Sequence, residues 1–187
     1  VGTRGIDGAL STVLGMSLIN KDKIHFCLVG DLTFFYNVNA LGNRHVGNNL
    51  RIILVNNDGG AEFNLFQNRQ HQLIGADVNR FVAASGHNGR QSRNLVKHIS
   101  EDLGFMYMPV TTKEEAIHYF DLFFSPYLSG GPMIMEIFTD KDIESDAVKM
   151  IRNLVDEQSV SDKTTNVIKG VLGDKGVKFV KGLTKRN

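Results

Sequence analysis

The sequence has few of the features that mark specialised protein classes. Cys27 is its one cysteine, which excludes an internal disulfide framework, and its apolar neighbours suggest that it packs as a small hydrophobe. Lysine and arginine total 21 against 20 acidic residues, so no strong electrostatic field points toward nucleic acid. No apolar run approaches bilayer-spanning length and no signal peptide is visible, so we expect a cytoplasmic protein.

Familiar metal and phosphate motifs are also missing. The phosphate loop G-x-x-x-x-G-K-[ST] is absent, and the six histidines form no close pair that would suggest zinc. An EF-hand loop counted from Gly59 or Gly60 would put apolar residues at its ligand positions. The chain opens on Val1 in a loop-like stretch without an initiating Met, from which we expect a fragment of a longer protein.

Short apolar runs alternate with amphipathic stretches along most of the chain. This pattern predicts an α/β fold: a doubly wound, mostly parallel sheet with helices on both faces, because buried unalternated strands are typical of parallel sheets. The predicted strands are 24–29, 50–55, 105–108 and 132–138, and the predicted helices are 8–20, 33–46, 91–103 and 112–124. Residues 64–90 are polar and weakly periodic, and we expect a long loop there, with or without a short helix. We expect one binding domain over 1–157 and a helical or partly disordered tail over 158–187.

Polar residues follow two successive predicted strands directly. Gly30-Asp31-Leu32-Thr33 ends the first strand and Asn56-Asn57-Asp58-Gly59-Gly60 ends the second. Ligands bind beyond the carboxyl ends of strands in open parallel sheets, so both segments should border one crevice. Carboxylate and amide oxygens suit Mg²⁺, and the helix beginning near Thr33 favours an anion at its start. Singly, each segment is more often a turn or a helix cap, but their joint placement predicts a magnesium–diphosphate site.

The pairing of Gly30-Asp31-Leu32 with Asn56-Asn57 resembles the cofactor motif of thiamine-diphosphate-dependent enzymes. The likeness runs from Gly5 to about Thr139 and corresponds to the family's C-terminal, diphosphate-binding domain. It departs at Leu32, where the family often has glycine. The resemblance implies that Asp31, Asn57 and the Gly59 carbonyl bind Mg²⁺.

Further residues take roles through the same resemblance. It implies that Gly30, Leu32 and Thr33 meet the diphosphate, that Ile6 supports the bent cofactor, and that Phe63 lies at the substrate end. Glu62 replaces a usually apolar residue, and we expect either a proton donor or a solvent-facing side chain. The family also implies a 2-oxo acid substrate, a decarboxylation or carboligation, and a homo-oligomer in which a pyrimidine-binding domain contributes a glutamate.

Within the family, the chain most resembles 2-succinyl-5-enolpyruvyl-6-hydroxy-3-cyclohexene-1-carboxylate synthases of menaquinone biosynthesis. The stretches that carry this likeness are Gly5-Ile6-Asp7-Gly8, Asn39-Ala40-Leu41 and Asn56-Asn57-x-Gly59-Gly60. The arginine that reads a substrate carboxylate in those synthases is displaced here, to Arg4. Gly42-Asn43-Arg44-His45 and Gly86-His87 instead resemble relatives associated with surface polysaccharides, and an acetolactate-synthase-like enzyme is a further alternative.

Two alternatives belong to other classes: a non-catalytic module that binds Mg²⁺ with a diphosphate or nucleotide, and an oligomerisation domain with a vestigial site. For the enzyme reading, we predict that the isolated chain is inactive, because it has no room for the pyrimidine-binding domain. It should then expose apolar surface where that domain docks. The aromatic candidates for this surface are Phe34, Phe35, Tyr36, Phe63 and Phe66.

Overall fold

The computed structural model describes residues 5–86 and 92–154. The chain divides into two compact units, Val1–Ser145 and Asp146–Asn187, and each is described by itself. Arg4, His87 and the predicted tail 158–187 lie outside the described residues. Among the residues described, no helix combines the length and the apolarity needed to cross a membrane.

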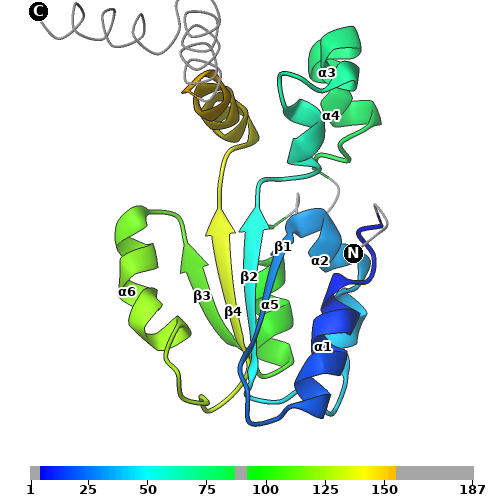
Figure 1. The fold of residues 1–187 in the computed structure, drawn as a ribbon. Helices are drawn as coiled ribbons and strands as arrows, with labels where there is room; N and C mark the ends of the chain where they lie inside the picture. The colour runs from blue at the N-terminus through cyan, green and yellow to red at the C-terminus, as the bar shows by residue number, and fades with distance from the viewer. Residues whose placement is uncertain (1–4, 87–91, 155–187) are drawn as a thin grey trace, which may run out of the picture. The chain divides into compact units, whose positions relative to one another are not determined.

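The first unit is built on a four-stranded sheet in which every neighbouring pair is parallel (Figure 1). The strands are β1 (His25–Gly30), β2 (Leu50–Asn56), β3 (Met106–Val110) and β4 (Met133–Phe138), and their order across the sheet is β1-β2-β4-β3. The predicted parallel α/β fold is thereby confirmed, and each predicted strand lies within two residues of an observed one.

Helices cover both faces of the sheet. One face packs against α1 (Ala9–Ile19), α2 (Asp31–Tyr36), η1 (Val38–Gly42) and α5 (Leu95–Asp102), around a core that includes Leu10, Phe34, Ile52, Val96 and Ile134. The other face packs against α6 (Lys113–Phe123), around Met108, Phe123, Met133 and Met135. On this second face the outer strand β1 is poorly covered, and its Phe26 and Leu28 are 47% and 71% exposed.

Two predicted segments differ from the structure. The helix expected over 33–46 ends at Tyr36 and is followed by the 3-10 turn η1. At the break, the Asn37 side-chain oxygen accepts hydrogen bonds from the Ser11 backbone N–H and hydroxyl, at 2.9 and 2.6 Å. Asn37 therefore ties α1 to this turn instead of continuing the helix, as short polar side chains commonly do.

The segment expected as a long loop over 64–90 consists largely of short helical turns. These are η2 (Ala61–Asn64), α3 (Arg69–Ile74), η3 (Gly75–Asp77) and α4 (Val78–Phe81). Asn68 caps α3 by accepting a hydrogen bond from the Gln70 N–H at 3.0 Å. No residue of α3 is buried, so its sequence has no apolar face to reveal it. After β4, residues 141–154 are helical.

Candidate functional site

The two polar segments lie side by side at the carboxyl ends of neighbouring strands. In the parallel register Gly30 pairs with Val55, so β1 and β2 end together. Asp31 begins α2 directly after β1, and the loop from Asn57 to Gly60 follows β2. The crossover predicted from the sequence therefore brings the two motifs to one edge of the sheet.

The Asp31 carboxylate connects the two segments. Its Oδ2 atom accepts a hydrogen bond from the Gly59 backbone N–H at 2.7 Å, and Oδ1 accepts one from the Leu32 N–H at 2.8 Å. Asp31 is only 4% exposed. Within the described residues no Lys, Arg or His forms an ion pair with it. A buried carboxylate without a counter-charge is costly, and a bound cation would relieve that cost.

The electrostatics of Asp31 agree with this geometry. Burial raises the pKa of the Asp31 carboxyl above its usual value, and the nearby negative charge of Asp58 raises it further. The N–H groups of Leu32 and Gly59 pull the pKa the other way but do not offset the burial. The site therefore favours a positive charge close to Asp31.

The loop after β2 is held in a conformation that requires glycine. Gly59 has a positive φ of 138°, and a Cβ there would lie 2.8 Å from both the Ala83 carbonyl oxygen and the Ser85 hydroxyl. The Gly60 N–H donates to the Ala83 carbonyl at 2.7 Å, and the Gly86 N–H donates to the Asp58 carboxylate at 3.0 Å. Residues 83–86 thus brace the loop that carries Asn57 and Gly59.

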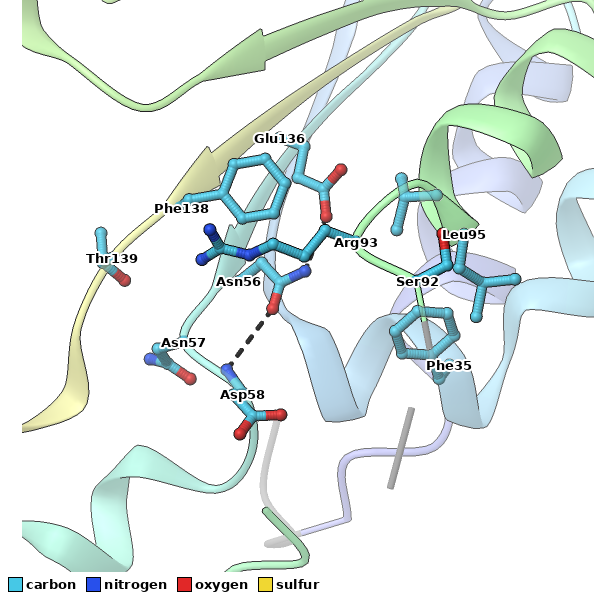
Figure 2. Close-up of a pocket in the computed structure, with 11 residues that line it drawn as sticks. Phe35, Asn56, Asn57, Asp58, Ser92, Arg93, Leu95, Glu136, Phe138 and Thr139 are labelled. Atoms are coloured by element: carbon cyan, nitrogen blue, oxygen red, sulfur yellow. Dashed lines mark hydrogen bonds between the residues drawn. The ribbon is translucent and has the colours of Figure 1, made fainter. Parts of the chain in front are cut away.

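Asn57 is half-buried, and its amide is oriented by a residue that the sequence did not single out. Its Nδ2 atom donates a hydrogen bond to Glu144 Oε2 at 2.9 Å. Figure 2 shows the amide oxygen of Asn57 on the side that faces Asp58 and the nitrogen turned away from it. The oxygen that a metal would need is therefore not the atom used to hold the side chain.

The other predicted site residues lie at different distances from this centre. Gly30 and Leu32 flank Asp31, and Thr33 is half-buried in the first turn of α2. Glu62 and Phe63 lie on η2, which follows the loop directly; Glu62 is exposed and Phe63 half-buried. Ile6 is 44% exposed before α1. Hydrogen bonds thus join Asp31, Leu32 and Gly59, while Thr33, Glu62, Phe63 and Ile6 are placed only by their elements.

The expected aromatic docking surface is corrected in part. Phe34 is fully buried in the core, where its ring packs edge-on against Phe35 at 5.4 Å between centroids. It cannot contact a partner domain. Tyr36 is 64% exposed, whereas Phe63 and Phe66 are half-buried.

A cavity of about 280 Å³ opens beside the Asn57 loop, between the ends of β2 and β4 and the start of α5 (Figure 2). Glu136 lies at this cavity and is fully buried. Its carboxylate accepts hydrogen bonds from Asn56 Nδ2 at 2.6 Å and from the Tyr107 hydroxyl at 2.5 Å. Burial raises the pKa of the Glu136 carboxyl. A lone acidic residue in the predicted strand 132–138 was the signal that could have located it.

The described residues contain no group of three or more His, Cys, Asp or Glu side chains that could hold a metal ion. The donor set that is present consists of one carboxylate, one amide oxygen and a backbone carbonyl. Such a set fits a hard cation whose remaining ligands are waters or phosphate oxygens, which is how Mg²⁺ is usually bound.

Known proteins of similar sequence bear on this site. No family model matches the chain. A 2-succinyl-5-enolpyruvyl-6-hydroxy-3-cyclohexene-1-carboxylate synthase of Bacteroides fragilis is 38% identical over 152 residues, which cover 79% of the chain and 25% of that protein. The chain is a homologue of the C-terminal part of these synthases.

Two further synthases of the same name extend the comparison. The one from Phocaeicola vulgatus is 39% identical over 145 residues, covering 75% of the chain and 24% of that protein. The one from Christiangramia forsetii is 32% identical over 147 residues, covering 79% of the chain and 23% of that protein. The chain thus spans about a quarter of the length of these relatives. The matches confirm the resemblance to this branch of thiamine-diphosphate enzymes.

Proposed function

We propose that the chain binds the diphosphate of thiamine diphosphate through Mg²⁺, as one domain of a 2-oxo-acid decarboxylase or carboligase. The observation that carries this proposal is the Asp31 carboxylate, which is buried, forms no ion pair within the described residues and accepts a hydrogen bond from Gly59 in the loop after the neighbouring strand. A magnesium ion bound there would supply the missing positive charge, and the cofactor's phosphate oxygens would complete its coordination.

Asp31, Asn57 and the Gly59 carbonyl are the proposed metal ligands. The Gly59 carbonyl accepts a hydrogen bond from the Ala61 N–H at 3.0 Å, which leaves its second lone pair for the ion. The N–H groups of Leu32 and Thr33 and the Thr33 hydroxyl are proposed to meet the diphosphate. Gly30 is proposed to meet the diphosphate through its place directly before Asp31; a Cβ there would lie 4.0 Å from the Val55 carbonyl oxygen, an ordinary van der Waals distance.

When bound, thiamine diphosphate supplies a thiazolium carbon that adds to a 2-oxo acid and stores electrons once CO₂ has left. The part of this chain is to position the cofactor and keep water from it. Ile6 and Phe63 are proposed to contact the cofactor and the substrate end, and exposed Glu62 stays our candidate proton donor. By relation to the synthases, the proposed pathway is menaquinone biosynthesis, in a cytoplasmic homo-oligomer whose pyrimidine-binding domain completes the site.

Isothermal titration of the 187-residue chain with thiamine diphosphate, with and without Mg²⁺, tests the proposal. We expect metal-dependent binding that Asp31→Ala weakens by about 100-fold or more, because a charged ligand in a poorly solvated site is lost. Asp22→Ala, which removes an exposed carboxylate before the opposite, amino end of β1, is the matched control. Preference for a nucleoside diphosphate would favour the non-catalytic module instead. Equal binding by Asp31→Ala and wild type would refute the magnesium site.

The isolated chain should turn over no 2-oxo acid, because the activating glutamate of the family belongs to another domain. A coupled CO₂-release assay checks this expectation. Decarboxylation by this chain alone would contradict the proposed division of labour between domains.

A further inference from the structure

We infer that Glu144 is a positioning residue for the metal site, which fixes the Asn57 amide so that its oxygen, and not its nitrogen, is presented to the ion. The inference rests on the proposed function and adds a residue that lies outside both sequence motifs. Glu144 is 87 residues from Asn57 in the chain, and it accepts the Asn57 Nδ2–H at 2.9 Å.

The chemistry of the pair decides the orientation of the amide. A side-chain amide has a donating nitrogen and an accepting oxygen of nearly equal size, so packing alone distinguishes them poorly. An ionised carboxylate only accepts hydrogen bonds, so Glu144 can pair with the nitrogen and repels the oxygen. The amide oxygen of Asn57 is then directed to the opposite side, which Figure 2 shows to be the side of Asp58.

Glu144 is itself held from two directions. Its Oε1 atom accepts a hydrogen bond from the Thr139 hydroxyl at 2.5 Å, and the Thr139 N–H is bonded to the Asn56 carbonyl at 3.0 Å. Asp140 caps the helix that carries Glu144, since its Oδ1 accepts from the Asp142 and Ile143 N–H groups at 2.9 and 3.0 Å. Both carboxylate oxygens are therefore fixed relative to the end of β2.

The residue after Glu144 binds the next part of the site. Ser145 Oγ accepts a hydrogen bond from the Phe66 N–H at 3.2 Å and donates one to the Asn64 carbonyl at 3.3 Å. One helical turn therefore contacts both the metal loop and the end of η2, the turn that carries Glu62 and Phe63. This arrangement aligns the proposed metal ligand with the proposed substrate end.

Removing an outer-shell hydrogen bond to a metal ligand typically lowers metal affinity 10- to 100-fold. We expect Glu144→Gln to weaken Mn²⁺ binding about 10-fold in the presence of thiamine diphosphate, because glutamine pairs with either end of the amide. Electron paramagnetic resonance of free Mn²⁺ measures this affinity without any need for turnover. Glu114→Gln removes the same charge from an exposed position on α6 and should leave the affinity unchanged.

Exchanging the hydrogen-bond donor and acceptor between positions 57 and 144 tests whether Glu144 acts through its hydrogen bond to Asn57 or only through a general structural role. Asn57→Asp places two carboxylates face to face and should weaken Mn²⁺ binding. Adding Glu144→Gln to it restores a donor at position 144 and should recover affinity relative to Asn57→Asp alone. Melting temperatures without metal identify any variant that fails to fold, and the exchange pair then carries the test.

Three outcomes are distinguishable in the same assay. Weaker binding by Glu144→Gln together with recovery in the exchange pair supports the inference. Glu144→Gln behaving like Glu114→Gln, while Asp31→Ala abolishes binding, overturns the role of Glu144 and keeps the proposed function. Unchanged binding by Asp31→Ala overturns the proposed function, and the positioning role falls with it.

Discussion

The buried polar side chains at the amino end of the sheet are hydrogen-bond donors, whereas those at the carboxyl end include two acids. At the amino end, Arg51 is fully buried and donates to the carbonyls of Phe123, Ser125 and Tyr127 at 2.6, 2.6 and 2.7 Å. Asn49, 3% exposed, likewise donates to three carbonyls in and after α1, at 3.0 to 3.2 Å. Both are donors whose acceptors belong to the chain itself.

At the carboxyl end two acids are buried. Asp31 and Glu136 accept hydrogen bonds from neutral N–H and O–H groups, but neither forms an ion pair within the described residues. Buried charges in proteins are usually paired or bind metals. Polar burial at the amino end therefore satisfies the chain's own carbonyls, whereas the buried acids at the carboxyl end are what the proposed cation site predicts.

Removing Arg51 should have the largest effect on stability. Arg51→Met keeps much of the side-chain volume but leaves three carbonyls without their donor, at about 1 kcal/mol each, so we expect a loss of about 3 kcal/mol in unfolding free energy. Urea denaturation measures the loss, with exposed Arg69→Met as control. If the folded Arg51→Met variant bound Mn²⁺ more weakly than wild type, the buried donors at the amino end would also support the metal site, and the two ends would not have separate roles.

Removing the Asn49 side-chain amide should lower the unfolding free energy by less than removing Arg51. Asn49→Ala takes one amide group from the carbonyls of Ser17, Asn20 and Lys23. The Asn20 carbonyl keeps the Lys23 N–H as a donor at 3.2 Å, and we expect a loss of about 2 kcal/mol in unfolding free energy. The same urea titration measures it, with exposed Asn153→Ala expected to show no loss. A loss as small as that of the control would mean that this end of the sheet does not depend on its buried donors.

Replacing Glu136 should have the smallest effect on the unfolding free energy, and this effect should depend on pH. Because burial raises the pKa of its carboxyl above the usual 4.5, Glu136 contributes stability that is present below that value and is lost as pH rises through the folded-state pKa. Wild type should therefore lose stability relative to Glu136→Gln as pH increases above 4.5. Urea titrations of both proteins across this range measure the difference.

Glu115 is the control with the opposite sign. Hydrogen bonds from Thr111 and Thr112 lower the pKa of this exposed carboxyl, so its contribution is present above the usual 4.5 and is lost as pH falls. Wild type and Glu115→Gln should thus diverge in the reverse direction. If the difference in unfolding free energy between wild type and Glu136→Gln did not depend on pH, burial would not raise the pKa of the Glu136 carboxyl in the folded protein.

The sequence was most informative where patterns repeat along the chain. Unbroken apolar runs located all four strands, and the spacing of Asp31 and Asn57 placed both at one edge because a parallel crossover brings strand ends together. The short helices between Ala61 and Phe81 were not predicted individually, since three to six residues are too few to display an amphipathic period.

Contacts between distant residues were beyond the reach of pattern reasoning. Glu144 reaches Asn57 across 87 residues, and Tyr107 reaches Glu136 from a different strand. Neither pair leaves a fixed spacing in the sequence. The first depends on where the segment after β4 lies beside the end of β2, and the second on the pairing of β3 with β4. The tertiary packing alone determines these partners.

The exposed apolar side chains of the outer strand have a practical consequence for handling this chain. β1 pairs with β2 along one side, its other side meets no further strand within the described residues, and Phe26 and Leu28 project from its open face. Strands of this kind attract the backbone of other molecules and promote aggregation. We therefore expect concentrated preparations to self-associate through β1, and Leu28→Lys to reduce this self-association in crystallisation or NMR work.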